Sequence, residues 1–303
     1  MKPTHDYDVI VLTEPRFEVG DGTDWFTVQH MREEAFLLTA LNERGMRTRR
    51  VAWSSSGFDW GRVRAAVFRS TWDYFDRLSE FAAWVDQAAA VTRLVNSPEL
   101  VRWNWDKHYL RDLDERGVRT PPTVFIEAGT TGPDLPDLLA TSGWPRAVLK
   151  PAVSATGRHT YLVTAANADE HAHTFRDLGE REALLLQEFQ DDVLTSGELS
   201  LIAIGGRVTH AVRKIPRSGE FRVHDDHGGT VHSHTPTNDE VEFAERAVAA
   251  CGTAPAYARV DVVRTVDGRL ALMELELIEP ELFFRFCPEA ATALATELIR
   301  HLD

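Results

Sequence analysis

Cysteine is scarce in this chain: Cys251 and Cys287 are the only two among 303 residues. Two cysteines are too few for a disulfide framework or for a metal site built from thiolates. We therefore expect both to be inert, buried thiols. The four histidines of the segment 221–234 do not supply a metal site in their place, because their spacing fits no familiar zinc pattern. We interpret this segment as a polar loop beside a functional site.

Long apolar runs and an excess of basic residues are also missing. No run reaches the roughly 18 residues that a membrane span needs, and residues 8–12 are too short for the core of a signal peptide. The formal net charge is −14. Nucleic acids and anionic membranes attract basic surfaces, so we exclude both as partners and expect a cytoplasmic protein. A local basic site for a small anion is still compatible with this charge.

Strands alternate with amphipathic helices along the chain, which predicts the α/β class. A chain of this length is expected to form two or three lobes rather than one core. Gly45 closes a predicted helix over residues 30–45 of the first lobe. The buried strands of that lobe are expected at residues 8–12, 49–53 and 65–70.

A second helix is predicted to carry the chain out of the first lobe. Ser97 is its N-cap, Pro98 takes its first position, and Gly117 follows its end. Strands of a second lobe are then expected at 121–126 and 146–151, separated by a loop and a short helix. Longer hairpins are expected from residue 184 onwards.

Acidic residues interrupt the apolar segment 264–284 at regular intervals, at Glu274, Glu276, Glu279 and Glu281. The pair Asp267-Gly268 predicts a two-residue hairpin turn that pairs Val266 with Arg269. In this register Asp261 faces Glu274, and Arg259 faces Glu276. One face then holds three carboxylates and an arginine, while the other face takes Val260, Val262, Met273, Leu275 and Leu277.

Three carboxylates this close repel one another, and each would lose its charge on burial unless a cation held it. Hard oxygen ligands without Cys or His suit Mg²⁺, which is usually shared with the phosphates of a substrate. The alternative is a hairpin whose acidic face is merely solvated. Both interpretations are open at this point.

Two further segments carry charge in positions that suggest a site. Lys150 ends an apolar strand, and the loop of small residues from Ser154 to Gly157 could wrap a phosphate with its backbone N–H groups, unless it is an ordinary surface turn. A Gly205-Gly206 turn places Glu198 opposite Arg213. That pair could equally be a structural ion pair between two strands.

Together and in this order, these residues resemble the ATP-grasp ligases from about Lys107 to Phe284. The resemblance implies an ATP-grasp fold with a Rossmann-like lobe at 1–105, a central lobe at 106–186 and a C-terminal lobe at 187–303, with the nucleotide between the last two. It implies ATP contacts at Lys107, Lys150, Ser154, Thr156, Gly157, Gln187, Glu188, Phe189 and Glu198. It also implies metal ligands at Asp261, Glu274 and Glu276, and catalytic roles for Arg259 and for Arg213 or Lys214.

One departure from the family pattern is Glu276, which stands where most members carry Asn. A narrower resemblance, to the group that includes the cyclo-ligase forming D-cycloserine from O-ureido-serine, rests on residues 68–74, 96–110, 218–230 and 273–284. From it, and from the position of residues 69–73 after a first-lobe strand, we expect substrate contacts from Arg69, Ser70, Thr71, Asp73, Arg222 and Glu279.

The resemblance implies an ADP-forming ligase that uses ATP with two Mg²⁺ ions, or Mn²⁺, to convert a substrate carboxylate into an acyl phosphate. A nitrogen then attacks, either within the same amino-acid-like molecule or from a second amino acid. A small-molecule kinase with the same nucleotide site is a further alternative. The family also implies a homodimer as a frequent state.

Overall fold

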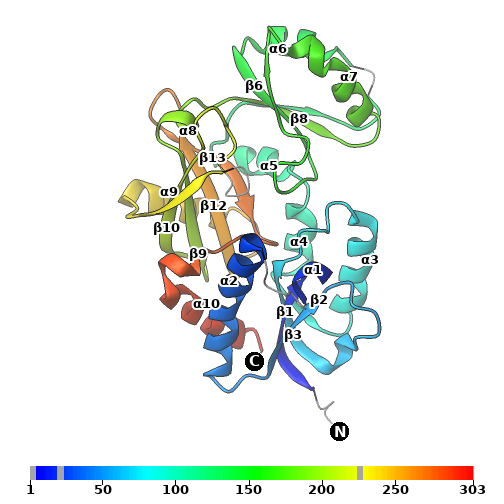
Figure 1. The fold of residues 1–303 in the computed structure, drawn as a ribbon, viewed down its shortest axis with the longest axis vertical. Helices are drawn as coiled ribbons and strands as arrows, with labels where there is room; N and C mark the ends of the chain where they lie inside the picture. Colours follow the sequence, from blue (N-terminus) through cyan, green and yellow to red (C-terminus); the bar gives the residue numbers. More distant parts are fainter. Residues whose placement is uncertain (1–4, 19–23, 131, 224–227, 303) are drawn as a thin grey trace.

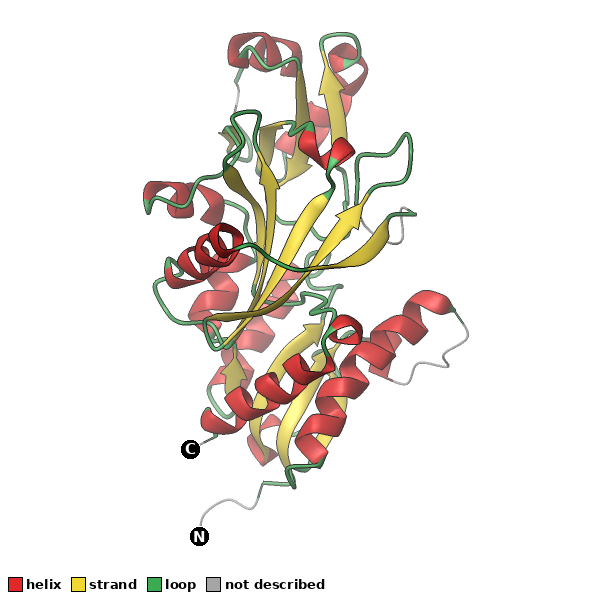
Figure 2. Ribbon diagram, turned by 90° about the vertical axis from the view of Figure 1, so that its left-hand side faces the viewer, coloured by secondary structure: helices red, strands yellow, loops and turns green. Residues whose placement is uncertain are grey.

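Three β-sheets organise the chain, and each belongs to a different part of the sequence (Figure 1). The computed structural model describes residues 5–18, 24–130, 132–223 and 228–302. Figures 1 and 2 show the first sheet at one end of the molecule, the second at the other end and the third between them. This mixed arrangement confirms the predicted α/β class.

The first sheet is parallel, with the strand order β2-β1-β3-β4. Both faces are covered: Val9 and Val11 lie in one apolar cluster, and Ile10 and Leu12 lie in another. Strands buried on two faces are apolar throughout, as the sequence shows here. The elements of this lobe are β1 (Tyr7–Thr13), α1 (Pro15–Glu18), α2 (Trp25–Asn42), β2 (Thr48–Ala52), η1 (Trp60–Arg62), β3 (Val63–Ser70), α3 (Leu78–Ala89) and β4 (Arg93–Val95).

The helix predicted between Ser97 and Gly117 is in fact two helices, α4 (Pro98–Asn104) and α5 (Tyr109–Glu115). The chain bends between them, where the backbone N–H of Lys107 donates to the carbonyl of Ala152 at 2.9 Å. Asp106 accepts the N–H of His108 at 3.0 Å, which stabilises the bend. The bend places Lys107 beside the end of a strand in the second lobe.

The second sheet is antiparallel, with the order β5-β8-β6-β7. Two helices pack on one side of it around Leu139 and Phe175. The chain order of this lobe is β5 (Thr123–Ile126), α6 (Leu135–Ser142), β6 (Arg146–Pro151), β7 (Tyr161–Thr164), α7 (Ala168–Gly179) and β8 (Leu184–Glu188).

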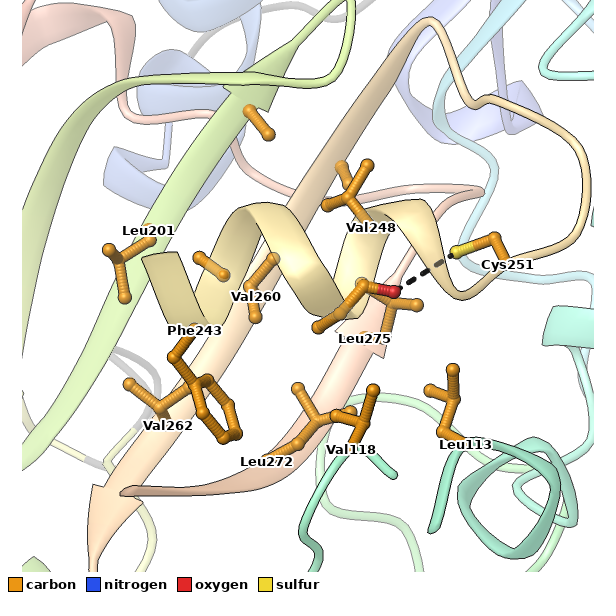
Figure 3. Packing of buried hydrophobic residues seen from close by; sticks show 14 of the residues in the cluster. Leu113, Val118, Leu201, Phe243, Val248, Cys251, Val260, Val262, Leu272 and Leu275 are labelled. Atoms are coloured by element: carbon orange, nitrogen blue, oxygen red, sulfur yellow. Dashed lines mark hydrogen bonds between the residues drawn. The ribbon is translucent and has the colours of Figure 1, made fainter. Parts of the chain in front are cut away.

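The third sheet has the order β11-β10-β9-β12-β13 and is also antiparallel. Helix α9 covers one face, where Figure 3 shows Phe243 and Val248 against Val260 and Leu275. The elements of this lobe are α8 (Asp192–Thr195), β9 (Glu198–Ile204), β10 (Arg207–Ile215), β11 (Thr230–His234), α9 (Asn238–Ala249), β12 (Tyr257–Arg264), β13 (Leu270–Glu276), η3 (Phe284–Phe286) and α10 (Pro288–Arg300).

The two cysteines differ in their surroundings. Cys251 is buried in the core under α9, and its Sγ lies 3.7 Å from the carbonyl oxygen of Ala247 (Figure 3). Burial raises the pKa of this thiol to about 12, which keeps it protonated and inert. Cys287 is only half-buried, at the start of α10, so the expectation that it is buried is wrong.

The hairpin of β12 and β13 has the predicted register at the acidic residues but a different turn. Asp261 pairs with Glu274 and Arg259 with Glu276, as expected. Near the turn the pairing is shifted by one residue, because Arg264 pairs with Leu270 and the predicted Val266–Arg269 pair does not form. A β-bulge after Asp261 restores the register.

A second bulge corrects another prediction. The Gly205-Gly206 turn pairs Ile204 with Arg207, as expected, but the register shifts between Val208 and His210. Glu198 therefore faces Lys214 and not Arg213. A shift by one residue turns a side chain to the opposite face of the sheet, so Lys214 replaces Arg213 beside Glu198.

The first lobe and the third sheet share one apolar core. Helices α2 and α10 pack against each other, and this cluster joins Leu37 of α2 and Leu294 of α10 to Val9 of β1 and Ile202 of β9. The two ends of the sequence are therefore held together by burial of apolar surface. None of the helices in the described residues is long and apolar enough to cross a membrane.

Candidate active site

A cavity lies where the ends of the second and third sheets meet the first lobe, and most of the predicted site residues line it. The structure brings together Lys107, Lys150, Ser154, Thr156, Gly157, Gln187, Glu188, Phe189, Glu198, Lys214, Arg222, Arg259, Asp261, Glu274, Glu276 and Glu279 on its wall. These residues come from eight separate stretches of sequence. Their convergence is a property of the fold and not of local sequence.

Two lysines and the loop of small residues form one end of the cavity. The Nζ of Lys107 donates to the carbonyl of Ser154 at 2.6 Å and lies 3.3 Å from Oε1 of Glu274. The Nζ of Lys150 donates to Oε1 of Gln187 at 3.2 Å. Burial lowers the pKa of Lys150 to about 8, and nearby Lys107 contributes to this shift. A bound anion would favour the charged form of Lys150.

The loop itself has an unusual backbone conformation. Thr156 and Gly157 are consecutive residues with positive φ, at 52° and 72°. None of the backbone N–H groups of residues 154–157 donates to another backbone group in the described part of the chain. Successive free N–H groups in such a turn can surround a phosphate.

Another part of the wall, next to the end of β8, is apolar. Val148 and Met273 line it from two different sheets, together with Val193 and Val223. Arg146 lies over the ring of Phe189, 4.7 Å from its centroid. Met273 therefore faces the cavity, and not the side opposite the carboxylates as predicted, because of the bulge in β13. A wall of this kind can accept a planar base.

Asp261 is the centre of the acidic face, and cations surround it. Its oxygens accept from Arg259 Nη2 at 2.9 Å, Lys214 Nζ at 3.0 Å and Ser200 Oγ at 2.6 Å. Burial alone would raise the pKa of Asp261, but Arg259 and Lys214 hold it well below its usual range. Lys214 also contacts Glu198, at 2.5 Å. Asp261 is thus anionic and fully paired.

Glu274 and Glu276 differ from Asp261 in their charge balance. Burial would raise the pKa of Glu274, but Lys107 and Lys150 lower it. Burial raises the pKa of Glu276 to about 8 despite its contact with Arg259, and it raises the pKa of Glu279 to about 7. The last two carboxylates therefore lack enough positive charge to ionise easily.

This donor set fits a divalent cation by its chemistry. The carboxylates offer hard oxygen ligands on one cavity wall, and a cation beside Glu276 would supply the missing positive charge. Among the described residues, however, no group of three or more Asp, Glu, His or Cys side chains is arranged so that it could hold a metal ion. Asp261 would first have to exchange a contact with Arg259 or Lys214.

Five predicted residues do not line the cavity. Arg213 donates to the carbonyl of Ser196, away from the acidic face. The other four lie in or after β3. Arg69 donates to the carbonyl of Pro280, and Ser70 donates to Glu34. Asp73 accepts hydrogen bonds from Trp53 and Arg77. The buried hydroxyl of Thr71 has no partner among the described residues. In this structure these side chains do not line the cavity, and their contact with a ligand stays a prediction.

The same segment reaches the cavity through its aromatic residues instead. Trp72 and Tyr74 line the wall, together with Phe26, Gln29 and His30 of α2. The spacing of residues 26, 29 and 30 places them on one face of a helix, so their grouping could have been predicted from the sequence. The position of Val148 could also have been predicted, because it lies on the same strand face as Lys150. Two predicted members of the histidine segment, His224 and His227, lie outside the described residues.

Comparison with known proteins agrees with this arrangement. Residues 9–96 match the family model described as "D-cycloserine synthetase DcsG, N-terminal domain", and residues 136–299 match the RimK-like ATP-grasp domain. The cycloserine biosynthesis protein DcsG of Streptomyces lavendulae is 32% identical over 285 residues, which cover 88% of this chain and 92% of that protein. A probable alpha-L-glutamate ligase of Xanthomonas axonopodis pv. citri is 32% identical over 167 residues, and the chain spans about half (52%) of its length.

Solved structures show the same fold. The crystal structure of D-cycloserine synthetase DcsG superposes with a TM-score of 0.84 at 27% identity, covering 97% of this chain and 99% of that one. D-alanyl-alanine synthetase A of Vibrio cholerae, at 15% identity with a TM-score of 0.68 and 99% of each chain covered, shares the fold. The chain therefore belongs to the ATP-grasp ligases with a RimK-like domain, which are ATP-dependent enzymes that form C–N bonds.

Proposed function

We propose that this ligase activates the carboxylate of a small amino-acid derivative as an acyl phosphate and closes a ring by attack of a nitrogen of the same molecule. The observation that carries the proposal is the single cavity in which two lysines, the turn from Ser154 to Gly157 and an acidic face meet an aromatic wall from the first lobe. Similarity to the cycloserine biosynthesis protein DcsG extends across both matched regions, which favours cyclisation of the O-ureido-D-serine type.

The nucleotide would lie between the second and third sheets. Its base would occupy the apolar wall beside Gln187, Glu188 and Phe189, and Glu198 would hold the ribose. Lys107, Lys150 and the turn from Ser154 to Gly157 would bind the phosphates. Closure of this turn over the phosphates would keep water from the reactive intermediate.

The metal ligands in this proposal are Asp261, Glu274 and Glu276. Two Mg²⁺ ions, or Mn²⁺, would neutralise the charge that builds up on the transferred phosphoryl group. Glu274 and Glu276 have the most room for an ion, whereas Asp261 would have to release part of its contact with Arg259 or Lys214. The glutamate at 276, where Asn is usual, already has a cation beside it in Arg259.

The reaction takes place in two chemical steps. The substrate carboxylate attacks the γ-phosphorus, the bond from that phosphorus to the bridging oxygen breaks, and ADP leaves. The substrate nitrogen then attacks the acyl carbon and loses a proton, and inorganic phosphate leaves with one former carboxylate oxygen. Arg259 and Lys214 would stabilise the negative charge on the acyl oxygen and on the departing phosphate. Arg222 and Glu279 would contact the substrate.

Release of ADP across a panel of amino acids tests the proposal, with O-ureido-serine of both configurations included and the products identified by mass. We expect ADP release with a single amino-acid derivative and a ring-closed product that has lost one water; with O-ureido-serine the free ring, cycloserine, has also lost the carbamoyl group carried by the attacking nitrogen. A product that keeps the phosphoryl group would indicate a kinase, and a strict requirement for a second amino acid would indicate an intermolecular amide ligase. We expect a homodimer and the three-lobe division at residues 105 and 186 as further properties of the enzyme.

A further inference from the structure

The first lobe contributes a histidine to the cavity that neither the nucleotide site nor the acidic face uses. His30 lies on α2, and its side chain lines the cavity with Phe26 and Trp72. Its ring centroid lies 4.2 Å from that of Phe26 and 4.4 Å from that of Trp72, at steep angles of 71° and 72°. The imidazole is therefore held edge-on between two aromatic rings, in one orientation.

The Nε2 atom of His30 is buried and has no hydrogen-bond partner in the described part of the chain. The residue as a whole is only 7% exposed. A buried polar atom without a partner costs free energy, so such atoms are rare in folded proteins. An unsatisfied nitrogen on a cavity wall is explained if a ligand supplies the missing partner.

The surroundings decide the charge of that partner. Burial and the nearby Arg285, Arg16 and Arg69 together lower the pKa of His30 to about 3, so the imidazole is neutral at physiological pH. The positive charge of the same arginines, which do not line the cavity, would repel a cationic group at Nε2. An anionic group would meet Glu279 and Glu281, which line the same cavity.

Trp72 is fixed in place by the loop that carries these glutamates. Its indole Nε1 donates to the carbonyl of Glu279 at 3.1 Å, and Gln29 donates to Glu281 at 3.3 Å. Glu281 also pairs with Arg285. The aromatic wall and the acidic loop thus form one preorganised surface, and neither can turn away without breaking these contacts.

From this geometry we infer that His30, between Phe26 and Trp72, selects substrates that carry an uncharged amide-like group, which hydrogen-bonds to Nε2 and packs against the two rings. The inference rests on the proposed function, because it names the substrate class of that same site. His30 is then a specificity-determining residue, and it takes no part in phosphoryl transfer.

The test compares the Michaelis constants of three enzymes: the wild type, His30→Leu and His30→Gln. Substrates with amide or urea ends (glutamine, asparagine and both configurations of O-ureido-serine) are compared with lysine, ornithine, glutamate and alanine in the ADP-release assay. We expect the wild type to favour an amide or urea substrate. His30→Leu should raise the KM for that substrate on the order of 10-fold, since one hydrogen bond to a buried group is lost. It should leave the KM for ATP within twofold, and His30→Gln should recover part of the loss.

Phe17→Leu is the matched control. Phe17 contacts the ring of His30, at 5.8 Å between centroids, but does not line the cavity. If His30 were only a packing residue, this variant and His30→Leu would change the KM alike, and the inference would be wrong. Preference for a charged or a plain aliphatic substrate would also overturn it, while ADP release and the ATP constant would stay intact. Absence of ADP release with every amino acid would instead remove the proposed function and this inference together.

Discussion

Glu274 and Asp261 face each other across two strands, yet their replacement should have different consequences. The side chain of Glu274 is 31% exposed and has one ionic contact, with Lys107 at 3.3 Å. Glu274→Gln keeps the volume and removes a proposed metal ligand. We expect ADP release to fall on the order of 100-fold or more, with the melting temperature nearly unchanged. Turnover near the wild-type rate would refute the metal assignment.

Asp261→Asn should lose both activity and stability. The substitution leaves Arg259 and Lys214 buried with too little negative charge beside them. Breaking a buried ion pair by removing one partner costs about 3 kcal/mol or more of the free energy of unfolding. Urea denaturation of Asp261→Asn and Glu274→Gln, measured side by side, checks this contrast. Equal stability of the two variants would show that the ion pairs around Asp261 contribute little.

Asp8 provides a pH test away from the cavity. Burial would raise the pKa of Asp8, but hydrogen bonds from Arg47 and Arg64 lower it to about 2. A folded pKa below the ordinary value of 3.8 means that the ionised form stabilises the fold above that pH. This stabilisation is lost as the pH falls from about 4 towards about 2.

Asp8→Asn should therefore be less stable than the wild type at neutral pH, and the difference should shrink below about pH 4. The free energy of unfolding of both proteins, measured from pH 7 down to pH 3, gives this difference directly. A difference that stays constant over the whole range would mean that the arginines do not shift the titration of Asp8.

At the scale of elements, the hairpin of β9 and β10 depends on one glycine. Gly197 has φ +78°, and a Cβ added there would lie 2.3 Å from the carbonyl oxygen of Lys214. Gly197→Ala must therefore displace the backbone of β10 at Lys214, next to the acidic face. We expect a loss of about 2 kcal/mol or more in the free energy of unfolding, together with a clear loss of ADP release.

Gly206 in the turn of the same hairpin is the control. It also has positive φ, at 79°, but a Cβ added there would meet nothing within 4 Å. Gly206→Ala should cost about 1 kcal/mol from backbone strain alone and leave activity near normal. An equal loss of activity in both variants would mean that the close approach of residue 197 to the carbonyl of Lys214 does not cause the loss.

The hairpins also show which parts of the site could be predicted from the sequence. The pairing of Asp261 with Glu274 was predicted correctly from the Asp-Gly turn, although the turn itself differs by one residue and the bulge after Asp261 offsets that difference. The partner of Glu198 was predicted wrongly because a bulge adds one residue to a strand. The residue types in this hairpin do not indicate where the bulge lies. The break after α4 was missed for a similar reason: the sequence favours a helix there, and a tertiary hydrogen bond from Lys107 to Ala152 overrides it.

In the first lobe, too, the sequence alone did not show which side chains face the cavity. The segment 68–74 was predicted to be part of the site, and it lines the cavity through side chains other than the ones proposed as substrate contacts. After a strand ends, the direction of each side chain depends on the loop that follows, and here the loop turns Trp72 and Tyr74 to the cavity and Asp73 towards Trp53 and Arg77. Asp73 was proposed from its position after a strand and from the resemblance, and its contacts in this structure are with Trp53 and Arg77.

At the scale of the whole molecule, the cavity depends on all three sheets at once. A ligand that binds only the folded arrangement must stabilise it by mass action. We expect ATP with Mg²⁺ to raise the melting temperature of the wild type by several degrees at saturating concentration, and to do so much less for Glu274→Gln. A rise of equal size in both proteins would place the nucleotide and its metal ion elsewhere.

The most direct test of the proposed chemistry follows one oxygen atom. If the carboxylate of the substrate attacks the γ-phosphorus and a nitrogen then displaces phosphate, one carboxylate oxygen must leave with that phosphate. With the accepted substrate labelled by ¹⁸O in its carboxylate, mass spectrometry should detect inorganic phosphate that carries one ¹⁸O atom per turnover. Release of unlabelled phosphate alongside the ring-closed or amide product would contradict the acyl-phosphate mechanism.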